Sequence, residues 1–146
     1  MRTGALVLAL LLASCNGADK APAISIDNAW ARATVGPQGS SAAYFTIRNT
    51  GGADSLLSVS SPGANASLHS TSMDNGVMRM RRLAKLDVPA NSTVELKPGG
   101  THVMLMALKA PLTARSTIRL DLKFEHSPDK IVTATVKPAA SDGAGM

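Results

Sequence analysis

Apolar and polar residues alternate along short runs of this chain, and each run ends at residues that favour turns. Between residues 117 and 125, Ile, Leu, Leu and Phe fall on one face of an extended strand, while Thr, Arg, Asp, Lys and Glu fall on the other. A period of two residues is typical of a half-buried β-strand. The sequence contains no convincing amphipathic helix. We therefore expect a fold built from strands.

Nine such runs lie between turn-forming pairs such as Gly-Gly, Pro-Gly and Asn-Gly. The expected strands are residues 24–32, 41–48, 56–60, 66–73, 77–82, 93–97, 102–108, 116–125 and 130–137. Half-buried strands in this number, within ~115 residues, favour an antiparallel β-sandwich. With 146 residues, 45% of them hydrophobic and 17% charged, the chain is long enough for one core but short for two. We predict an all-β protein with a single domain.

The first residues are typical of a secretory signal. Arg2 precedes an apolar run at residues 5–12, which is too short to span a bilayer comfortably. The sequence Leu-Ala-Ser-Cys that ends at Cys15 resembles a bacterial lipobox, in which cleavage exposes a cysteine that carries lipid; an ordinary signal peptide is the alternative. Cys15 is the only cysteine in the sequence, so no intrachain disulfide is expected. The expected organisation is a signal peptide at 1–14, lipidated Cys15 with a polar tether at 15–22, one folded domain at 23–138 and a flexible tail at 139–146.

Composition argues against two broad classes of function. The net charge of +5 is of the sign that nucleic acid attracts, but only 3% of the residues are aromatic. Proteins that bind RNA or single strands usually stack bases on aromatic side chains. The sequence also lacks a nucleophile elbow, a zinc-protease motif and a phosphate-binding loop. We therefore expect neither nucleic-acid binding nor catalysis.

Histidine and methionine gather around one Asn-Gly pair. Residues 68–80 hold one of the three histidines and three of the seven methionines. An Asn-Gly pair favours a two-residue type I′ turn, which would pair Met73 with Met78. The same register would make His69 and Met80 diagonal neighbours on one face, with Cα atoms ~7–8 Å apart. Two ligands at that separation can meet at an ion between them.

A second patch lies at residues 101–106, where His102 and Met104 alternate with apolar residues and so share one face of a strand. Thioether sulfur is a soft, neutral donor that suits Cu(I) and is a poor ligand for zinc, calcium or magnesium. Cu(II) would be held more weakly, through the histidines. Spacing alone leaves two interpretations open, a copper site formed by both patches or a core rich in methionine.

The spacing of these residues resembles a known motif. His69, ten residues, Met80, twenty-one residues, His102, one residue and Met104 match the H-x10-M-x21-H-x-M copper motif of the periplasmic copper chaperone family, PCuAC. The segments DNGVMRMR and VPANSTVELKPGGTHVMLMALKAPL are also family-like, and the resemblance covers residues 24–137. It implies a cupredoxin-like Greek-key β-sandwich in which these four residues are the metal ligands.

The resemblance also implies a function outside the cytoplasm. A family member would be a periplasmic metallochaperone that supplies Cu(I) to the dinuclear copper centre of cytochrome c oxidase subunit II. A thiol-bearing transfer partner is the other acceptor we consider. The lipid on Cys15 would hold the protein at the membrane, and we expect a monomer. One departure is Ser70, where some relatives have Met after the first histidine. Participation of Met73, Met78 or Met106 is left open. The alternatives are a copper-sequestering resistance lipoprotein of the same fold and a metal-free adhesion lipoprotein.

Overall fold

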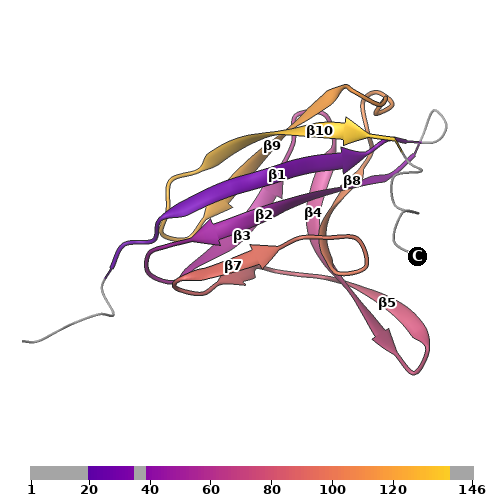
Figure 1. Ribbon diagram of the computed structural model, residues 1–146. Coiled ribbons are helices and arrows are strands. Elements are labelled where there is room, and N and C mark those ends of the chain that lie inside the picture. The colour runs from indigo at the N-terminus through magenta and orange to yellow at the C-terminus, as the bar shows by residue number, and fades with distance from the viewer. Residues whose placement is uncertain (1–19, 35–38, 139–146) are drawn as a thin grey trace, which may run out of the picture.

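The computed structural model describes residues 20–34 and 39–138, and these residues form ten β-strands and no helix (Figure 1). The strands are β1 Ile24–Arg32, β2 Ser41–Asn49, β3 Asp54–Ser60, β4 Asn65–Asp74, β5 Val77–Arg82, β6 Leu86–Val88, β7 Ser92–Glu95, β8 Thr101–Met106, β9 Thr117–Phe124 and β10 Lys130–Lys137. All nine expected strands are confirmed, with ends that differ by two residues or fewer. The short strand β6 was not predicted, because three residues are too few to show alternation.

The predicted signal peptide, Cys15 and the tail at 139–146 lie outside the described residues. Within the described ranges, no helix has the length and apolar character that crossing a bilayer would need.

The strands pair into one continuous sheet in the order β5-β4-β8-β2-β1-β10-β9-β3-β6, with β7 added beside β2. Among the described residues, every pair is antiparallel except β1 and β10, which run parallel around residues 30–32 and 135–137 (Figure 1). The predicted all-β single domain is confirmed, and the parallel pair is a detail that alternation could not reveal. A parallel pair needs a long connection, and here almost the whole domain separates the two strands.

The core is mostly aliphatic, with Phe45 and Phe124 as its aromatic members. The alternation read from residues 117–125 is confirmed, because the apolar residues of β9 are buried while most of its polar residues are exposed. The largest fully buried apolar side chains are Phe45, Ile47, Leu56, Leu105, Leu120 and Leu122. On β8, Val103 and Leu105 face this core, so His102 and Met104, which alternate with them, project from the opposite face of the strand.

One buried amide joins three segments at the end of β2. The side chain of Asn49 is 1% exposed. Its Oδ1 accepts hydrogen bonds from the backbone N–H groups of Ala23 at 3.2 Å and Gly51 at 3.0 Å. Its Nδ2 donates to the carbonyl oxygens of Gly52 at 2.7 Å and Pro89 at 3.1 Å. Asn49 therefore holds the N-terminal segment and two turns together.

At the same corner, two positions have no room for a side chain and are occupied by glycine. A Cβ atom on Gly51 would lie 2.1 Å from the carbonyl oxygen of Ala21, and one on Gly52 would lie 1.9 Å from that of Lys20. Backbone atoms cannot approach a Cβ so closely, so the glycines are required by the close passage of the chain. Residues 20–23 are consequently seated against the domain.

A buried carboxylate organises the start of β3. Asp54 is 5% exposed and accepts hydrogen bonds from the backbone N–H groups of Ser55 at 2.8 Å, His126 at 2.9 Å and Ser127 at 3.1 Å, and from the Ser127 hydroxyl. Burial acts to raise the pKa of Asp54. The hydrogen bonds from Ser127, His126 and Ser55 together outweigh burial, so this pKa lies below its ordinary value of 3.8.

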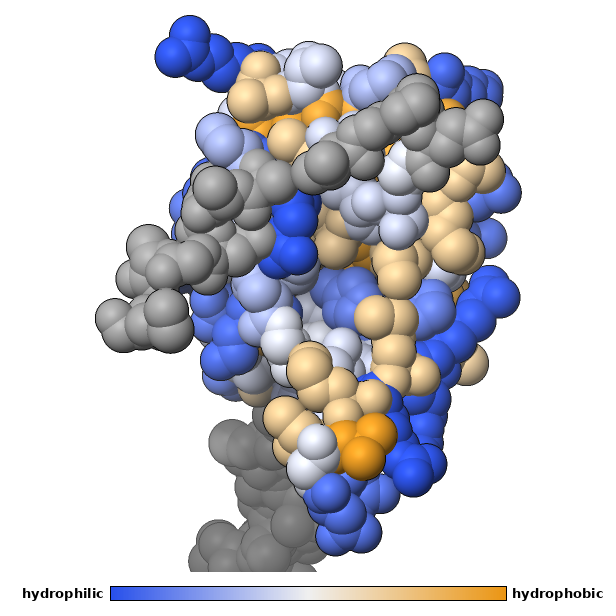
Figure 2. All heavy atoms as spheres, turned by 90° about the vertical axis from the view of Figure 1, so that its right-hand side faces the viewer, coloured by the Kyte–Doolittle hydropathy of each residue, from blue (hydrophilic) through white to orange (hydrophobic). Residues whose placement is uncertain are grey.

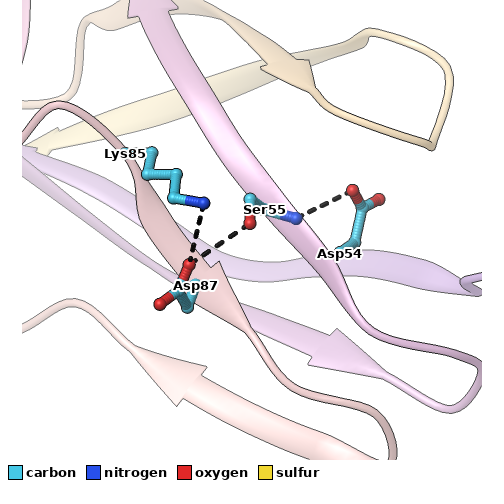
Figure 3. A network of polar contacts seen from close by, with 4 residues as sticks. All are labelled: Asp54, Ser55, Lys85 and Asp87. Atoms are coloured by element: carbon cyan, nitrogen blue, oxygen red, sulfur yellow. Dashed lines mark hydrogen bonds and ion pairs between the residues drawn. The ribbon is translucent and has the colours of Figure 1, made fainter.

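The network continues from β3 to β6 (Figure 3). The Ser55 hydroxyl donates to Oδ1 of Asp87 at 3.3 Å, and Nζ of Lys85 lies 3.7 Å from the same oxygen. The ion pair between Lys85 and Asp87 is exposed and adds little to stability. The buried bonds of Asp54 are the part of this network that matters for stability.

The Asp54→Asn substitution is expected to lower the free energy of unfolding at neutral pH by about 1–3 kcal/mol, because an amide nitrogen cannot accept the bonds that the second carboxylate oxygen accepts. A folded-state pKa below the unfolded value stabilises the fold above pH ~4, and this contribution is lost as the pH falls through the folded pKa. Urea unfolding of both proteins across this pH range should therefore show a difference that shrinks in acid. Asp129→Asn, at an exposed position, is the control, and a difference that stayed constant into strong acid would contradict the argument.

Candidate metal centre

The strand pairing brings both histidines of the motif face to face. In the antiparallel pair of β4 and β8, His69 lies directly opposite His102, and Ser67 lies directly opposite Met104. Residues that are directly opposite in a sheet project from the same face. His69, His102 and Met104 therefore share the face that is turned away from the core.

The hairpin of β4 and β5 places the fourth residue on that face. Asn75 and Gly76 have φ angles of 49° and 77°, as a type I′ turn requires. Thr71 lies directly opposite Met80, so Met80 is the diagonal neighbour of His69. The predicted hairpin register is confirmed, and the four predicted residues lie on one face of three adjacent strands.

The two imidazole rings are close, and exposure varies among the four residues. The ring centroids of His69 and His102 are 6.0 Å apart with an interplanar angle of 21°. His102 is 6% exposed although it faces away from the core, whereas Met80 is 52% exposed. The arrangement is therefore sheltered at His102 and open to solvent at Met80.

The hydrogen bond of His102 leaves one ring nitrogen available. Its Nδ1 lies 3.1 Å from the carbonyl oxygen of Gly100. A carbonyl oxygen can only accept a hydrogen bond, so Nδ1 carries the proton in the neutral ring and Nε2 keeps its lone pair. A backbone carbonyl that orients a histidine in this way is a common feature of metal sites.

His69 carries a buried nitrogen without a hydrogen-bond partner. Its Nε2 lies 3.0 Å from Oγ of Ser67, while its Nδ1 is buried and has no partner among the described residues. Buried polar atoms are nearly always paired. A bound metal ion would supply the partner that this nitrogen lacks. Burial, with His102 and Arg82 nearby, lowers the pKa of His69 below 6.5. The ring is therefore neutral at neutral pH, as metal binding requires.

A cavity of ≈ 280 Å³ opens beside these residues. Met80, His102 and Met104 line it together with Tyr44 and Met78. His69 is not part of the lining, although its ring stacks on that of His102. A larger groove of ≈ 500 Å³ lies between β1 and β10, but its lining contains neither histidine nor methionine.

The donor set at this face is two imidazoles with two thioethers. In the part of the chain that the structure describes, no group of three or more His, Cys, Asp or Glu side chains could hold a metal ion. A zinc or calcium centre of ordinary composition is thus unsupported there. The nitrogen and sulfur donors present fit a soft monovalent ion such as Cu(I).

The aromatic side chains beside His102, here called the aromatic wall, were not predicted from the sequence. A bulge in β1 between Asp27 and Trp30, with Asn28 at a φ of 53°, sets Trp30 opposite Tyr44. Their ring centroids are 4.5 Å apart, and the Tyr44 ring lies 6.5 Å from that of His102. No local pattern in the sequence signals a bulge of this kind.

Comparisons with known proteins relate the chain to a family of lipoproteins. A family model described as "Putative lipoprotein LpqE-like" matches residues 24–136. The chain is 35% identical over 121 residues to "Putative lipoprotein Lxx21020" of Leifsonia xyli subsp. xyli (strain CTCB07), covering 81% of this chain and 72% of the relative.

Solved structures share the fold. The copper-bound PCuAC domain from PmoF2 matches with a TM-score of 0.67 at 23% identity, covering 79% of this chain and 92% of that domain. The solution structure of CuI-DR1885 from Deinococcus radiodurans matches with a TM-score of 0.60 at 31% identity, covering 83% of this chain and 82% of that one. The resemblance to the PCuAC family that was drawn from the motif is confirmed.

Proposed function

The chain belongs to the LpqE-like lipoprotein family and has the fold of PCuAC domains, and from this premise we propose that it is an extracytoplasmic copper metallochaperone. His69, Met80, His102 and Met104 are the proposed ligands of Cu(I), with Cu(II) held more weakly through the histidines. The observation that carries the proposal is the direct opposition of His69 and His102 on a face that also bears both thioethers.

The chemistry of these donors supports transport rather than permanent storage. All four are neutral, so the bound site would carry only the charge of the ion. Thiolates would bind Cu(I) more strongly, and the only cysteine of the chain is Cys15, far from this face in sequence. Met80 is half exposed, so an acceptor can replace it first and then displace the more sheltered ligands in turn.

We assign delivery to the dinuclear copper centre of cytochrome c oxidase subunit II, directly or through a thiol-bearing transfer partner. The support is the motif and the family, together with exposed Arg82, which lies directly opposite His69 on the face of the site and would attract an acidic acceptor surface. In this proposal residues 1–14 are a signal peptide, Cys15 carries lipid, and a monomer works in the periplasm at the membrane. No catalytic step is assigned.

Deletion of the gene tests the delivery step. We expect oxidase activity to fall and to return when copper is added to the medium, because excess copper bypasses a carrier. The gene for the intact protein should restore activity without added copper, whereas the His102→Ala variant should not. Copper sensitivity with normal respiration would instead identify a sequestering protein of the same fold.

A further inference from the structure

We propose that Met73 and Met78 form a second, exposed Cu(I) site at the tip of the β4–β5 hairpin, with Met80 shared between this site and the one described above. We call the three residues the thioether ladder. We call the site of His69, Met80, His102 and Met104 the inner site. The proposal rests on the proposed function in one respect, since the ladder is assigned to loading and unloading the inner site.

The hairpin register places the three sulfur-bearing side chains together. Met73 lies directly opposite Met78. In a two-residue hairpin the pair next to the turn exchanges hydrogen bonds, so Met73 and Met78 form the next, non-hydrogen-bonded pair, in which Cα atoms lie only ~4.5 Å apart. Met80 follows Met78 by two residues and therefore projects from the same face.

Exposure distinguishes the ladder from a methionine core. Met73 and Met78 are 67% and 62% exposed, whereas methionine that fills a core is buried. Figure 2 views the molecule from the side to which the hairpin extends in Figure 1, and apolar surface gathers toward the bottom of that view with hydrophilic groups around it. The side chains are thus free to bend toward one ion.

The ladder is continuous with the inner site. Met78 and Met80 line the same cavity as His102 and Met104. An ion bound by Met73 and Met78 at the tip can therefore exchange one thioether at a time, first gaining Met80 and then reaching His102. The ion stays Cu(I) throughout, and because thioethers carry no proton, no electron or proton has to be supplied or removed.

The two or three thioethers of the tip are expected to bind Cu(I) more weakly than the two imidazoles and two thioethers of the inner site. The tip would consequently be empty when one ion is bound and would fill only transiently, during arrival and departure. Such a site suits the most exposed part of the hairpin, because a partner can reach it without disturbing His69 or His102.

The test is an NMR titration with Ag(I), a soft ion that is redox-inert. The protein is labelled with 13C at the methionine methyl groups, and the chemical shifts of these groups are measured. The first equivalent is expected to shift the signals of Met80 and Met104. Further Ag(I) should shift Met73 and Met78 while Met106, which is also exposed and on β8, stays unchanged. Shifts of Met73 and Met78 no larger than those of Met106 would overturn the ladder, whereas failure of the first equivalent to shift Met80 and Met104 would overturn the inner site instead.

A variant gives the functional readout. Met73→Leu combined with Met78→Leu keeps the apolar surface but removes both sulfurs. We expect transfer to a small thiol acceptor to be slowed by about tenfold or more, because the tip no longer holds the ion at high effective concentration, while the four ligands of the inner site still bind the first Cu(I). Met106→Leu is the matched control. Equal transfer rates in the double variant and the control would show that these methionines serve only as an apolar contact.

Discussion

Replacing His102 with alanine is expected to lower the affinity for Cu(I) by about 100-fold or more. Removing a group that merely orients a metal ligand already costs about 10–100-fold in affinity, and here a ligand itself is lost. His102 is also the most buried member of the set, so water does not easily take its place. Competition with a Cu(I) chelator measures the loss, and X-ray absorption should count one nitrogen scatterer fewer than in the parent protein.

The matched control is His126→Ala, because the His126 side chain is exposed and lies far in sequence from the motif. Its copper affinity should equal that of the parent. Unfolding of the metal-free His102→Ala variant shows whether the fold persists, and His102→Gln, which retains polarity at the buried position, gives a second measurement. Parent-like affinity in both folded His102 variants would contradict the assignment.

Asn49→Ala is expected to lower the free energy of unfolding by about 3 kcal/mol or more. The substitution leaves the N–H groups of Ala23 and Gly51 and the carbonyl oxygens of Gly52 and Pro89 without their present partner. Each buried polar group left unpaired costs roughly 1–3 kcal/mol. Chemical denaturation followed by circular dichroism measures the difference.

Asn65→Ala is the control for this prediction, because Asn65 is exposed on β4 and its replacement should change stability by less than about 0.5 kcal/mol. Copper affinity of the Asn49→Ala variant should remain close to that of the parent wherever the variant is folded. A loss of stability no greater than that of the control would mean that water replaces the amide.

Local pattern predicted most of the strands and one hairpin. Alternation located β9 because one of its faces is buried, and the Asn75-Gly76 turn determined the register of β4 against β5. Pairing between distant segments is different, since no turn links β4 to β8 or β1 to β10. The direct opposition of His69 and His102 therefore emerged only from the structure.

The motif identified the candidate ligands but not their surroundings. Neither the carbonyl of Gly100 that orients His102 nor the hydroxyl of Ser67 beside His69 belongs to a recognisable pattern. Hydrogen bonds of this kind depend on ring orientation, which follows from packing in three dimensions. The aromatic wall at Tyr44 likewise depends on the bulge in β1.

The seating of residues 20–23 against Gly51 and Gly52 limits how far this corner of the domain could lie from a bilayer. This corner and the β4–β5 hairpin lie at opposite ends of the molecule (Figure 1). If Cys15 carries the lipid, the five residue steps to Lys20 can reach at most about 18 Å, so the corner stays near the headgroups. The methionine-bearing hairpin would then be the part of the domain farthest from the tether, where proteins that rise above the lipid surface could reach it.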